Sequence, residues 1–245
     1  GGKTIMIYFD NAATTFKKPK EVTDVINYAL VSYTNSGRGA YKAALDSGRM
    51  VYEARVKLAS FFGACDPSRV IFTSNATEAL NITLFGLFHT GDHVISTVTE
   101  HNSVLRPLYK LESTKGVGLD FVGIDECGRL KYDEFEKYIR PDTKAIVINH
   151  ISNVSGEIAD IEYVGEIAKK HNLYLIVDAS QSAGSINIDM NKTGIDILCF
   201  TGHKSLFGPG GTGGIVINSD IMLDTFKVGG SGVQSFNKNQ PSEYP

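Results

Sequence analysis

Short apolar segments bounded by turn residues alternate with amphipathic helical stretches from about residue 20 onward. This alternation is typical of βαβ units, in which helices cover the faces of a sheet. Most of the apolar segments are continuous runs, as expected for strands that are buried on both faces. The predicted strands are 70–73, 93–98, 119–123, 145–149, 174–178, 195–200 and 214–217. The predicted fold class is therefore α/β, with a mostly parallel sheet flanked by helices.

Two of the predicted helices carry clear signals, and the end of the chain carries none. Five apolar residues at helical spacing predict one face of a long helix: Ala44, Val51, Ala54, Leu58 and Phe61. A second helix is predicted after the N-cap Asp160, with three inward residues and a basic last turn: Ile161, Val164, Ile167, Lys169 and Lys170. Residues 229–245 lose this periodicity, and their Gly, Ser, Asn and Pro content predicts a loop.

The charge balance excludes several classes of partner. The 245 residues include 24 Lys and Arg against 27 Asp and Glu, a net charge of −3, and no basic run is longer than Lys17-Lys18. We therefore expect no nucleic-acid partner and no anionic membrane surface as a partner. No apolar run reaches the roughly 18 residues of a transmembrane helix.

The cysteines and histidines do not form sequence motifs for disulfides or metals. Cys65, Cys127 and Cys199 are odd in number and widely spaced, which favours a reducing compartment, and we expect a cytoplasmic protein. His89 and His93 flank a predicted turn with no third ligand nearby, so we expect no metal site.

Lys204 is the first candidate for chemistry. It follows the predicted strand 195–200 and precedes the glycine-rich turn 208–213, so its amine can be held at the rim of a sheet with a lowered pKa, ready to form a Schiff base. The alternative is a solvated surface lysine. The turn itself matches GxGxxG but precedes a predicted strand rather than a helix, so a dinucleotide site is not expected.

Asp178 ends the apolar strand 174–178, and a carboxylate at that buried place requires a cationic partner. Asp178 either caps the following turn or pairs with a protonated pyridine nitrogen, in which case Gln181 would donate to an oxygen on the same ring. An Asp for the ring nitrogen and a Schiff-base Lys are the known requirements of pyridoxal 5′-phosphate (PLP).

A phosphate site is predicted where the strand 70–73 meets the next helix. Asn75 and Glu78 have the spacing of a capping box, which leaves the N–H groups of Ala76 and Thr77 free at the positive end of the helix dipole. An ordinary capped helix is the alternative. His101 follows the strand 93–98 and either lays its imidazole on a bound ring or simply begins a helix in contact with solvent.

Six segments taken together resemble the class V aminotransferase family, and within it the NifS/SufS-like cysteine desulfurases. They are Asp10-Asn11-Ala12-Ala13-Thr14-Thr15, Asn75-Ala76-Thr77-Glu78, Glu100-His101-Asn102, His150-Ile151-Ser152-Asn153-Val154, Asp178-Ala179-Ser180-Gln181 and Thr201-Gly202-His203-Lys204. The resemblance runs from about residue 8 to the end. It implies the large domain of a fold type I PLP-dependent transferase, with a likewise implied homodimer.

The resemblance also implies roles for these residues. Lys204 would carry PLP and shuttle the Cα proton of the substrate, L-cysteine, while a cysteine thiolate takes the sulfur and leaves alanine. The other implied cofactor contacts are Asp178 on the ring nitrogen, Gln181 on the phenolic oxygen, His101 on the ring face, Thr77, Thr201 and His203 on the phosphate, and Asn153 near the ring oxygen and the substrate.

Two departures from the family pattern qualify what the resemblance implies. The attacking cysteine and the carboxylate-binding arginine belong, in the family, to a C-terminal small domain, which we expect to be absent from this chain. Residues 1–20 are then an N-terminal segment and 21–245 the PLP-binding domain, inactive alone. Tyr41 replaces a frequent active-site histidine. The alternatives are another class V enzyme (selenocysteine lyase, epimerase or aminotransferase) or a fragment that folds without turnover, and a sulfur-acceptor protein is a possible partner.

Overall fold

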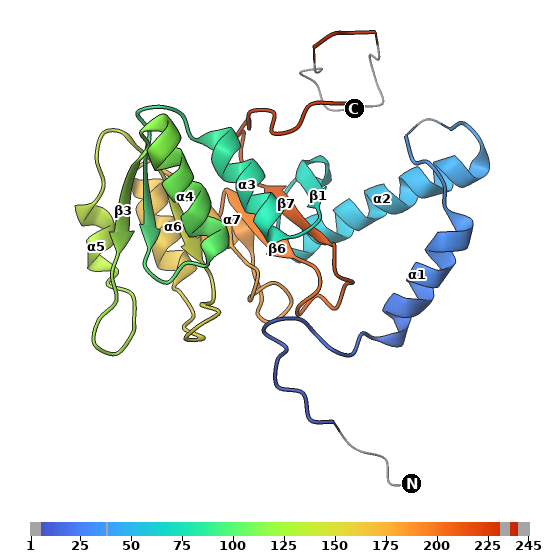
Figure 1. Cartoon of the computed structure of the whole chain (residues 1–245), viewed down its shortest axis with the longest axis horizontal. Coiled ribbons are helices and arrows are strands. Elements are labelled where there is room, and N and C mark those ends of the chain that lie inside the picture. Colours follow the sequence, from blue (N-terminus) through green and yellow to red (C-terminus); the bar gives the residue numbers. More distant parts are fainter. Residues whose placement is uncertain (1–5, 38, 231–235, 240–245) are drawn as a thin grey trace.

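The computed structural model describes residues 6–37, 39–230 and 236–239, and a single mixed sheet lies at their centre (Figure 1). The strands among these residues are β1 Val70–Thr73, β2 His93–Thr97, β3 Gly118–Val122, β4 Thr143–Asn149, β5 Tyr174–Asp178, β6 Ile197–Thr201 and β7 Gly213–Ile217. The helices are α1 Lys20–Ser32, α2 Lys42–Phe61, η1 Pro67–Arg69, α3 Ala76–Leu87, α4 Asn102–Lys115, α5 Asp133–Lys137, α6 Ile161–Lys170 and α7 Met190–Thr193. Every predicted strand is present, with ends displaced by no more than a few residues.

The strands are ordered β1-β7-β6-β5-β4-β2-β3. The five strands from β6 to β3 are parallel to one another, which confirms the predicted mostly parallel sheet. Strand β7 runs antiparallel to both β6 and β1, and the sequence analysis did not predict this. The reason is the connection: residues 202–212 join β6 to β7 without the crossover helix that a parallel pair needs.

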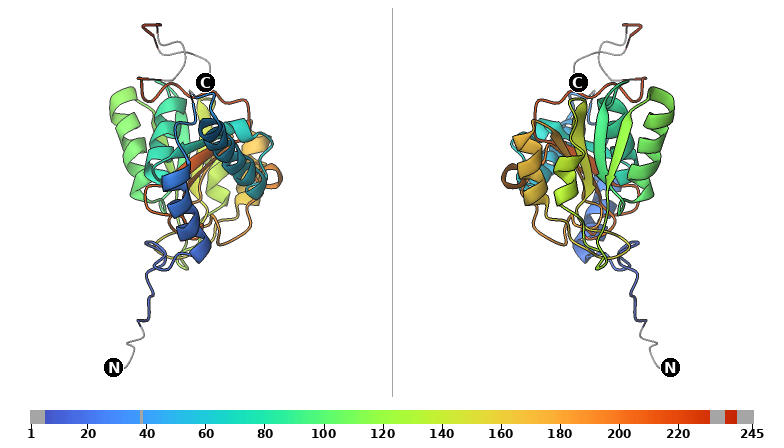
Figure 2. Two further views of the ribbon diagram at one scale, coloured as in Figure 1. Left: turned by 90° about the vertical axis from the view of Figure 1, so that its right-hand side faces the viewer. Right: turned by 90° about the vertical axis from the view of Figure 1, so that its left-hand side faces the viewer.

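Both faces of the sheet are buried, as the continuous apolar strands predicted. Leu175 and Val177 point to the cluster that also holds Phe62 and Phe135, whereas the intervening Ile176 points to the opposite cluster. Figure 2 shows the green helix α4 and the yellow helix α6 on opposite sides of the sheet. Because successive strand residues face opposite sides, each strand contributes to both layers.

The two predicted helices differ in how well they bury their apolar faces. In α6 the Asp160 side chain accepts the N–H of Tyr163 at 3.0 Å, and Ile161, Val164 and Ile167 are buried, as predicted. In α2 the long helix is confirmed but its predicted face is not fully inward. Phe61 is 49% exposed, and the neighbouring Phe62 is buried instead.

The first turns of α2 extend away from the sheet, together with helix α1 (Figure 1). Ala44 in these turns is nevertheless buried, whereas Phe61 in the last turn is exposed, so distance from the sheet does not account for the exposure of Phe61. Helix α1 contains no buried residue. Among the described residues, no helix combines the length and the apolar character needed to cross a membrane.

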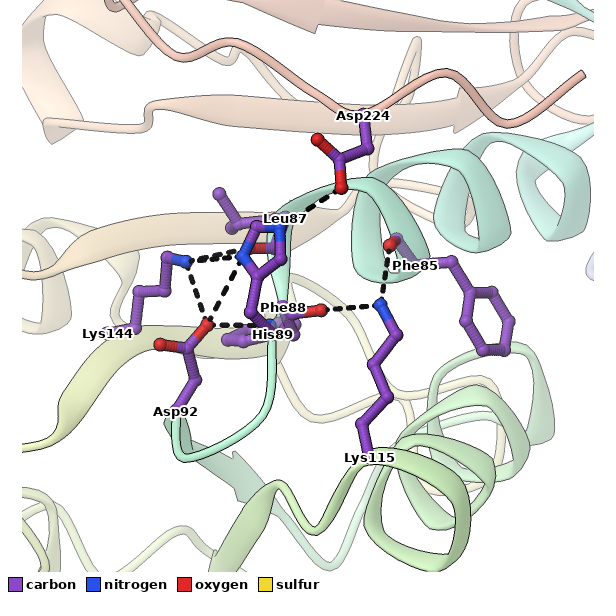
Figure 3. A network of polar contacts seen from close by, with 8 residues as sticks. All are labelled: Phe85, Leu87, Phe88, His89, Asp92, Lys115, Lys144 and Asp224. Carbon is purple, nitrogen blue, oxygen red and sulfur yellow. Dashed lines mark hydrogen bonds and ion pairs between the residues drawn. The ribbon is translucent and has the colours of Figure 1, made fainter.

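The segment after β7 lies against α3. The backbone N–H of Asp224 donates to the carbonyl of Gly86 at 2.9 Å, and the Asp224 carboxylate lies 3.0 Å from His89 Nε2 (Figure 3). A Cβ on Gly86 would lie only 3.1 Å from the carbonyl oxygen of Asp224, so glycine permits this close approach. The predicted loop 229–245 begins beyond this segment and lies largely outside the described residues.

Two lysines donate hydrogen bonds to free carbonyl groups at the same end of α3. Lys115 Nζ donates to the carbonyl of Phe88 at 2.8 Å, and Lys144 Nζ donates to that of Leu87 at 2.8 Å and pairs with Asp92 (Figure 3). Cations at a helix C-terminus satisfy its free carbonyls and complement its dipole. These contacts anchor α3 at the end opposite to the candidate site.

Candidate functional site

A cavity of about 480 Å³ opens where β4, β5 and β6 end, at the carboxyl edge of the parallel strands. All nine site residues predicted from the sequence line it: Ala76, Thr77, His101, Asn153, Asp178, Gln181, Thr201, His203 and Lys204. Ligands of open α/β sheets bind at this edge, because the strand ends and the following turns converge there. Residues that the sequence analysis did not assign also line the cavity, namely Asp10, Ala12, Ala13, Asn75, Ser103, Asn149, Ile151 and Ser180.

Asp178 lies at the end of β5 and is buried. Its Oδ1 accepts the backbone N–H of Ser180 at 2.9 Å and the Ser180 hydroxyl at 2.5 Å, so it does cap the following turn. Burial nevertheless raises its pKa, an effect that the two Ser180 hydrogen bonds only reduce. Asp178 forms no ion pair with any described residue, which leaves a place for a cationic group of a ligand.

Lys204 lies three residues beyond β6 and is half-buried. Burial lowers the pKa of its amine, and the attraction of Asp178 opposes that change. The ammonium group has no carboxylate within ion-pair distance in the part of the chain that the structure describes. A lysine in this state holds more neutral amine near pH 7 than a surface lysine, which makes it a better nucleophile and base.

The N-terminus of α3 faces the cavity with free donors. The Asn75 side chain accepts the N–H of Glu78 at 2.8 Å, which confirms the predicted N-cap. In the usual capping box the Glu78 carboxylate would accept the backbone N–H of the N-cap residue Asn75. Here it accepts the N–H of Ser74, the residue before the N-cap, at 2.8 Å. The first N–H groups of a helix have no partner within it, so those of Ala76 and Thr77 can bind an anion.

His101 is the N-cap of α4, and its ring is held from one side. Its Nδ1 accepts the backbone N–H of Ser103 at 3.1 Å and lies 2.9 Å from the Ser103 hydroxyl. That hydroxyl lies 2.8 Å from the hydroxyl of Thr77 on α3. The three side chains therefore join the starts of two helices at one wall of the cavity.

The N-terminal segment forms another wall, in contact with the loop that carries Lys204. The backbone N–H of Thr15 donates to the carbonyl of His203 at 3.2 Å, and Lys18 Nζ donates to the same carbonyl at 2.8 Å. Gln181 Nε2 donates to the carbonyl of Ala12 at 3.1 Å. The motif Asp10–Thr15 carried the resemblance, and it was the signal that could have placed this segment at the site.

The remaining predicted residues differ in exposure. Thr201 is buried and its hydroxyl donates to the carbonyl of Thr212 at 3.4 Å, whereas Asn153 is exposed on the turn after β4. His203 Nδ1 lies 3.0 Å from the Thr14 hydroxyl. Burial lowers the pKa of His203, and the nearby lysine cations lower it further.

Glu100 is a buried acid that contacts Asn149, one of the residues lining the cavity, and the sequence analysis gave it no role. Its Oε1 accepts the Thr97 hydroxyl at 2.7 Å and the N–H of Asn149 at 2.8 Å, while its Oε2 is buried and has no hydrogen-bond partner among the described residues. Burial raises the pKa of Glu100 to about 8. This carboxyl group therefore stays largely protonated at neutral pH.

No cysteine of the described chain lines the cavity. Cys65 and Cys127 are exposed elsewhere, and Cys199 is buried within β6, where burial raises its thiol pKa to about 12. A thiolate for nucleophilic chemistry is therefore not part of this site as described.

The site offers a combination of groups that few ligands can satisfy at once. It has an anion-binding helix N-terminus, a buried carboxylate without a cation, and a lysine whose pKa is lowered. A phosphorylated, cationic heteroaromatic aldehyde matches all three, because phosphate, ring nitrogen and carbonyl carbon each find a partner. PLP is such a molecule, so the residues present fit it.

Comparisons with known proteins agree with this chemistry. The sequence model for "Aminotransferase class-V" matches residues 7–244. A protein of Borreliella burgdorferi named probable cysteine desulfurase is 37% identical over 94% of this chain, and one of Pyrococcus abyssi with the same name is 34% identical over 94%. The chain spans 56% and 58% of those two proteins, a little over half of their length.

Solved structures give the same result for the fold. The apo structure of cysteine desulfurase from Thermococcus onnurineus NA1 superimposes with a TM-score of 0.86 at 34% identity, covering 92% of this chain and 57% of that one. SspA in complex with cysteine superimposes with a TM-score of 0.84 at 31% identity, covering 91% of this chain and 65% of that one.

Proposed function

Because this chain belongs to the class V aminotransferase family, whose cysteine desulfurase members depend on PLP, we propose that it is the cofactor-binding part of a cysteine desulfurase. Such an enzyme converts L-cysteine to L-alanine and passes the sulfur to a cysteine thiolate as a persulfide. One observation carries the proposal: Lys204, Asp178 and the N-terminus of α3 all face one cavity. If α3 were only an ordinary capped helix, Lys204 a surface lysine and Asp178 a turn cap, nothing would explain why all three line the same cavity.

The lining residues divide the contacts to PLP among them. Lys204 would attach the cofactor, and Asp178 would accept a charge-assisted hydrogen bond from its ring nitrogen. The remaining roles are Gln181 on the phenolic oxygen, His101 on the ring face, Ala76, Thr77, Thr201 and His203 on the phosphate, and Asn153 near the ring oxygen and substrate.

PLP supplies an electron sink that labilises the bonds at the substrate Cα. The lowered pKa of Lys204 suits it to take the Cα proton and return it, because a neutral amine is needed at that moment. The buried carboxylate of Asp178 would stabilise positive charge on the ring nitrogen of bound PLP, since low-dielectric surroundings strengthen such an attraction. The thiolate that receives the sulfur would belong to a cysteine that does not line the described cavity.

The unpartnered apolar surface of α1 supports a homodimeric or larger assembly as part of this proposal. Its Val25, Tyr28, Leu30 and Val31 are all exposed, and Val31 is 85% exposed. An isolated amphipathic helix is marginal in water unless another surface covers its apolar side. A sulfur-acceptor protein is the further partner that persulfide chemistry requires.

The test is the attachment site of PLP on the 245-residue chain. We expect PLP to give an absorbance band that borohydride reduction makes permanent, and peptide mass spectrometry to find the reduced adduct on Lys204. Addition of L-cysteine before reduction should prevent the adduct by exchanging the lysine amine.

Lys18 is the nearest alternative to Lys204 as the lysine to which PLP attaches. Its amine also lies beside His203 and its pKa is also lowered by burial, but it does not line the cavity. A Lys18→Met variant should bind PLP as the parent chain does, whereas Lys204→Met should not form the adduct. An adduct on Lys18 or Lys227 in place of Lys204 would overturn the assignment.

A further inference from the structure

The contacts between Thr77, Ser103 and His101 fix which atom holds each proton. A backbone N–H can only donate, so the 3.1 Å contact from Ser103 N requires an unprotonated Nδ1 on His101. The neutral imidazole then carries its proton on Nε2.

The same reasoning orders the two hydroxyl groups. Because Nδ1 has no proton, only the Ser103 hydroxyl can donate across their 2.9 Å contact, and it shares the single Nδ1 lone pair with the backbone N–H. A serine hydroxyl has a single proton, so the 2.8 Å contact with Thr77 must be made by the Thr77 proton. The hydrogen bonds therefore run in one direction, from Thr77 to Ser103 to His101.

An unprotonated phosphate oxygen at the start of α3 would reverse this order, since such an oxygen only accepts hydrogen bonds. When Thr77 donates its proton to a phosphate oxygen, its hydroxyl oxygen can only accept from Ser103. The Ser103 hydroxyl then turns from His101 to Thr77, and Nδ1 keeps one donor, the backbone N–H of Ser103. No proton leaves its oxygen in this change, because each hydroxyl only rotates.

We infer that Ser103 is a positioning residue, whose hydroxyl transmits occupancy of the phosphate turn to the imidazole of His101. Ser103 is 8% exposed and lies between the two groups it joins, in the first turn of α4. The inference rests on the proposed function for the identity of the phosphate compound. It adds a consequence for the reaction: His101 presents its Nε2–H to the cavity, and the electron density of its ring depends on whether phosphate is bound.

The experiment is long-range ¹⁵N–¹H NMR of the imidazole groups in the 245-residue chain labelled with ¹⁵N-histidine. The His101 signals are assigned by their loss in His101→Asn. Inorganic phosphate is the probe, with sodium chloride at equal ionic strength as the control. In the parent chain we expect a neutral His101 protonated on Nε2, and a phosphate-induced displacement of the Nδ1 signal as it loses one of two donors.

Ser103→Ala should show, without phosphate, an Nδ1 signal close to that of the phosphate-bound parent chain, and should lose most of the phosphate-induced displacement. Ser103→Thr restores a hydroxyl and should restore the displacement. Ser113→Ala, a serine-to-alanine change near the other end of α4, should respond as the parent chain does. Thr77→Val interrupts the same chain from its other end and should also abolish the displacement. Because Thr77 is itself a proposed phosphate contact, this variant is compared with the parent chain at saturating phosphate, which keeps the test decisive if Ser103→Ala does not fold.

Three results would overturn the inference: a proton on Nδ1 in the ligand-free chain, no response to phosphate in the parent chain, or an equal response in Ser103→Ala. None of these depends on catalysis. Failure of PLP to attach to Lys204 would remove the proposed function and leave this experiment unchanged.

Discussion

Glu100 and Asn149 connect the segment that follows β2 to the end of β4, because the Glu100 carboxyl accepts the Asn149 backbone N–H at 2.8 Å. Asn149 pairs in register with Asp178 on β5. Two buried acids are therefore close together, and the charge of Asp178 adds to burial in raising the pKa of Glu100. Asp178 is the one that a cationic ligand can reach, since Asp178 lines the cavity and Glu100 does not.

The raised pKa of Glu100 makes stability depend on pH. Its pKa is about 8 in the folded chain against an ordinary value of 4.5, so between these values the folded state holds a proton that the unfolded state has lost. This group's contribution to stability is fully present below pH 4.5 and is lost as the pH rises toward 8. Glu100→Gln removes the dependence, because the amide does not titrate.

We therefore expect Glu100→Gln to become more stable relative to the parent chain as the pH rises from 5 to 8, by on the order of a few kcal/mol. Urea unfolding of both cofactor-free chains at the two pH values measures this. Glu112→Gln, an exposed change on α4, serves as the control and should show no such trend. A pH-independent difference between Glu100→Gln and the parent chain would contradict a buried, protonated Glu100.

Asp178→Asn should separate stability from cofactor affinity. Removing the buried charge should leave the cofactor-free chain at least as stable at pH 8, because burial raises the pKa of this carboxyl and so disfavours its charged form. Loss of a charge-assisted bond to the ring nitrogen should weaken PLP binding at least tenfold, the equivalent of roughly 1.4 kcal/mol or more.

Asp196 offers a matched control for this prediction. It precedes β6 at the opposite edge of the sheet, burial raises its pKa too, and its carboxylate accepts the N–H of Leu175 at 2.8 Å. Asp196→Asn should leave PLP affinity unchanged, as measured by absorbance titration. Equal PLP affinities of the Asp178→Asn variant and the parent chain would assign Asp178 to the turn alone.

The strands were predictable because each is a continuous apolar run that ends at turn residues, as in β5 from Tyr174 to Asp178. Their order was not, since the position of β7 between β1 and β6 depends on contacts between segments remote in sequence. The antiparallel direction of β7 follows from the connection 202–212, which contains no helix. The sequence predicted a glycine-rich turn directly before this strand, but the direction of the strand was not predicted from it. Local sequence thus predicted the elements and the long-range pairing decided the sheet.

The site also contains residues that local sequence could identify and residues that it could not. Lys204 and Asp178 could be placed at this edge because each follows a buried apolar strand, with a surface lysine and a turn cap as the alternatives. Their roles stay predictions. Ser103 and Glu100 were not assigned, because their importance depends on which hydroxyl or N–H their side chains meet across the fold. Both lie within two residues of His101 in the sequence, so only three-dimensional contacts distinguish them from ordinary residues of a helix start.

Gly184 tests how closely the turn after β5 must approach the Lys204 loop. Its φ is +87°, and a Cβ there would lie 2.5 Å from the carbonyl oxygen of Ser205, the residue after Lys204. Gly184→Ala therefore combines backbone strain with displacement of the loop, and should cost roughly 1–3 kcal/mol beyond the strain alone. We expect weaker PLP binding as well, because Lys204 moves with the loop.

Gly128 provides the control for strain, since its φ is +80° and an added Cβ would meet nothing within 4 Å. Gly128→Ala should show the strain alone, about 1–2 kcal/mol, with normal PLP affinity. Thermal unfolding and PLP titration of both variants provide the comparison. If the two alanine variants bind PLP equally well, close packing at Gly184 does not position Lys204.

Turnover of L-cysteine requires more than a bound cofactor. Breaking the Cβ–S bond of L-cysteine requires a thiolate placed to accept the sulfur, and interactions made in the transition state are the ones that accelerate this step. None of Cys65, Cys127 and Cys199 lines the described cavity, and burial raises the thiol pKa of Cys199 to about 12. We expect the PLP-loaded 245-residue chain to form alanine and sulfide from L-cysteine no faster than free PLP, within about tenfold, because the cofactor alone supplies the electron sink.

The same chain should still exchange the Cα proton of bound amino acids, since Lys204 is in place to move it. Solvent deuterium incorporation into L-alanine, measured by mass spectrometry, separates this step from sulfur transfer and should be abolished in Lys204→Met. Cys65→Ser, Cys127→Ser and Cys199→Ser should each leave the slow sulfide release unchanged. Rapid sulfide release that disappears in one of these three variants would show that the accepting thiolate belongs to this chain, and that its cysteines reach the cavity in a conformation other than the one described.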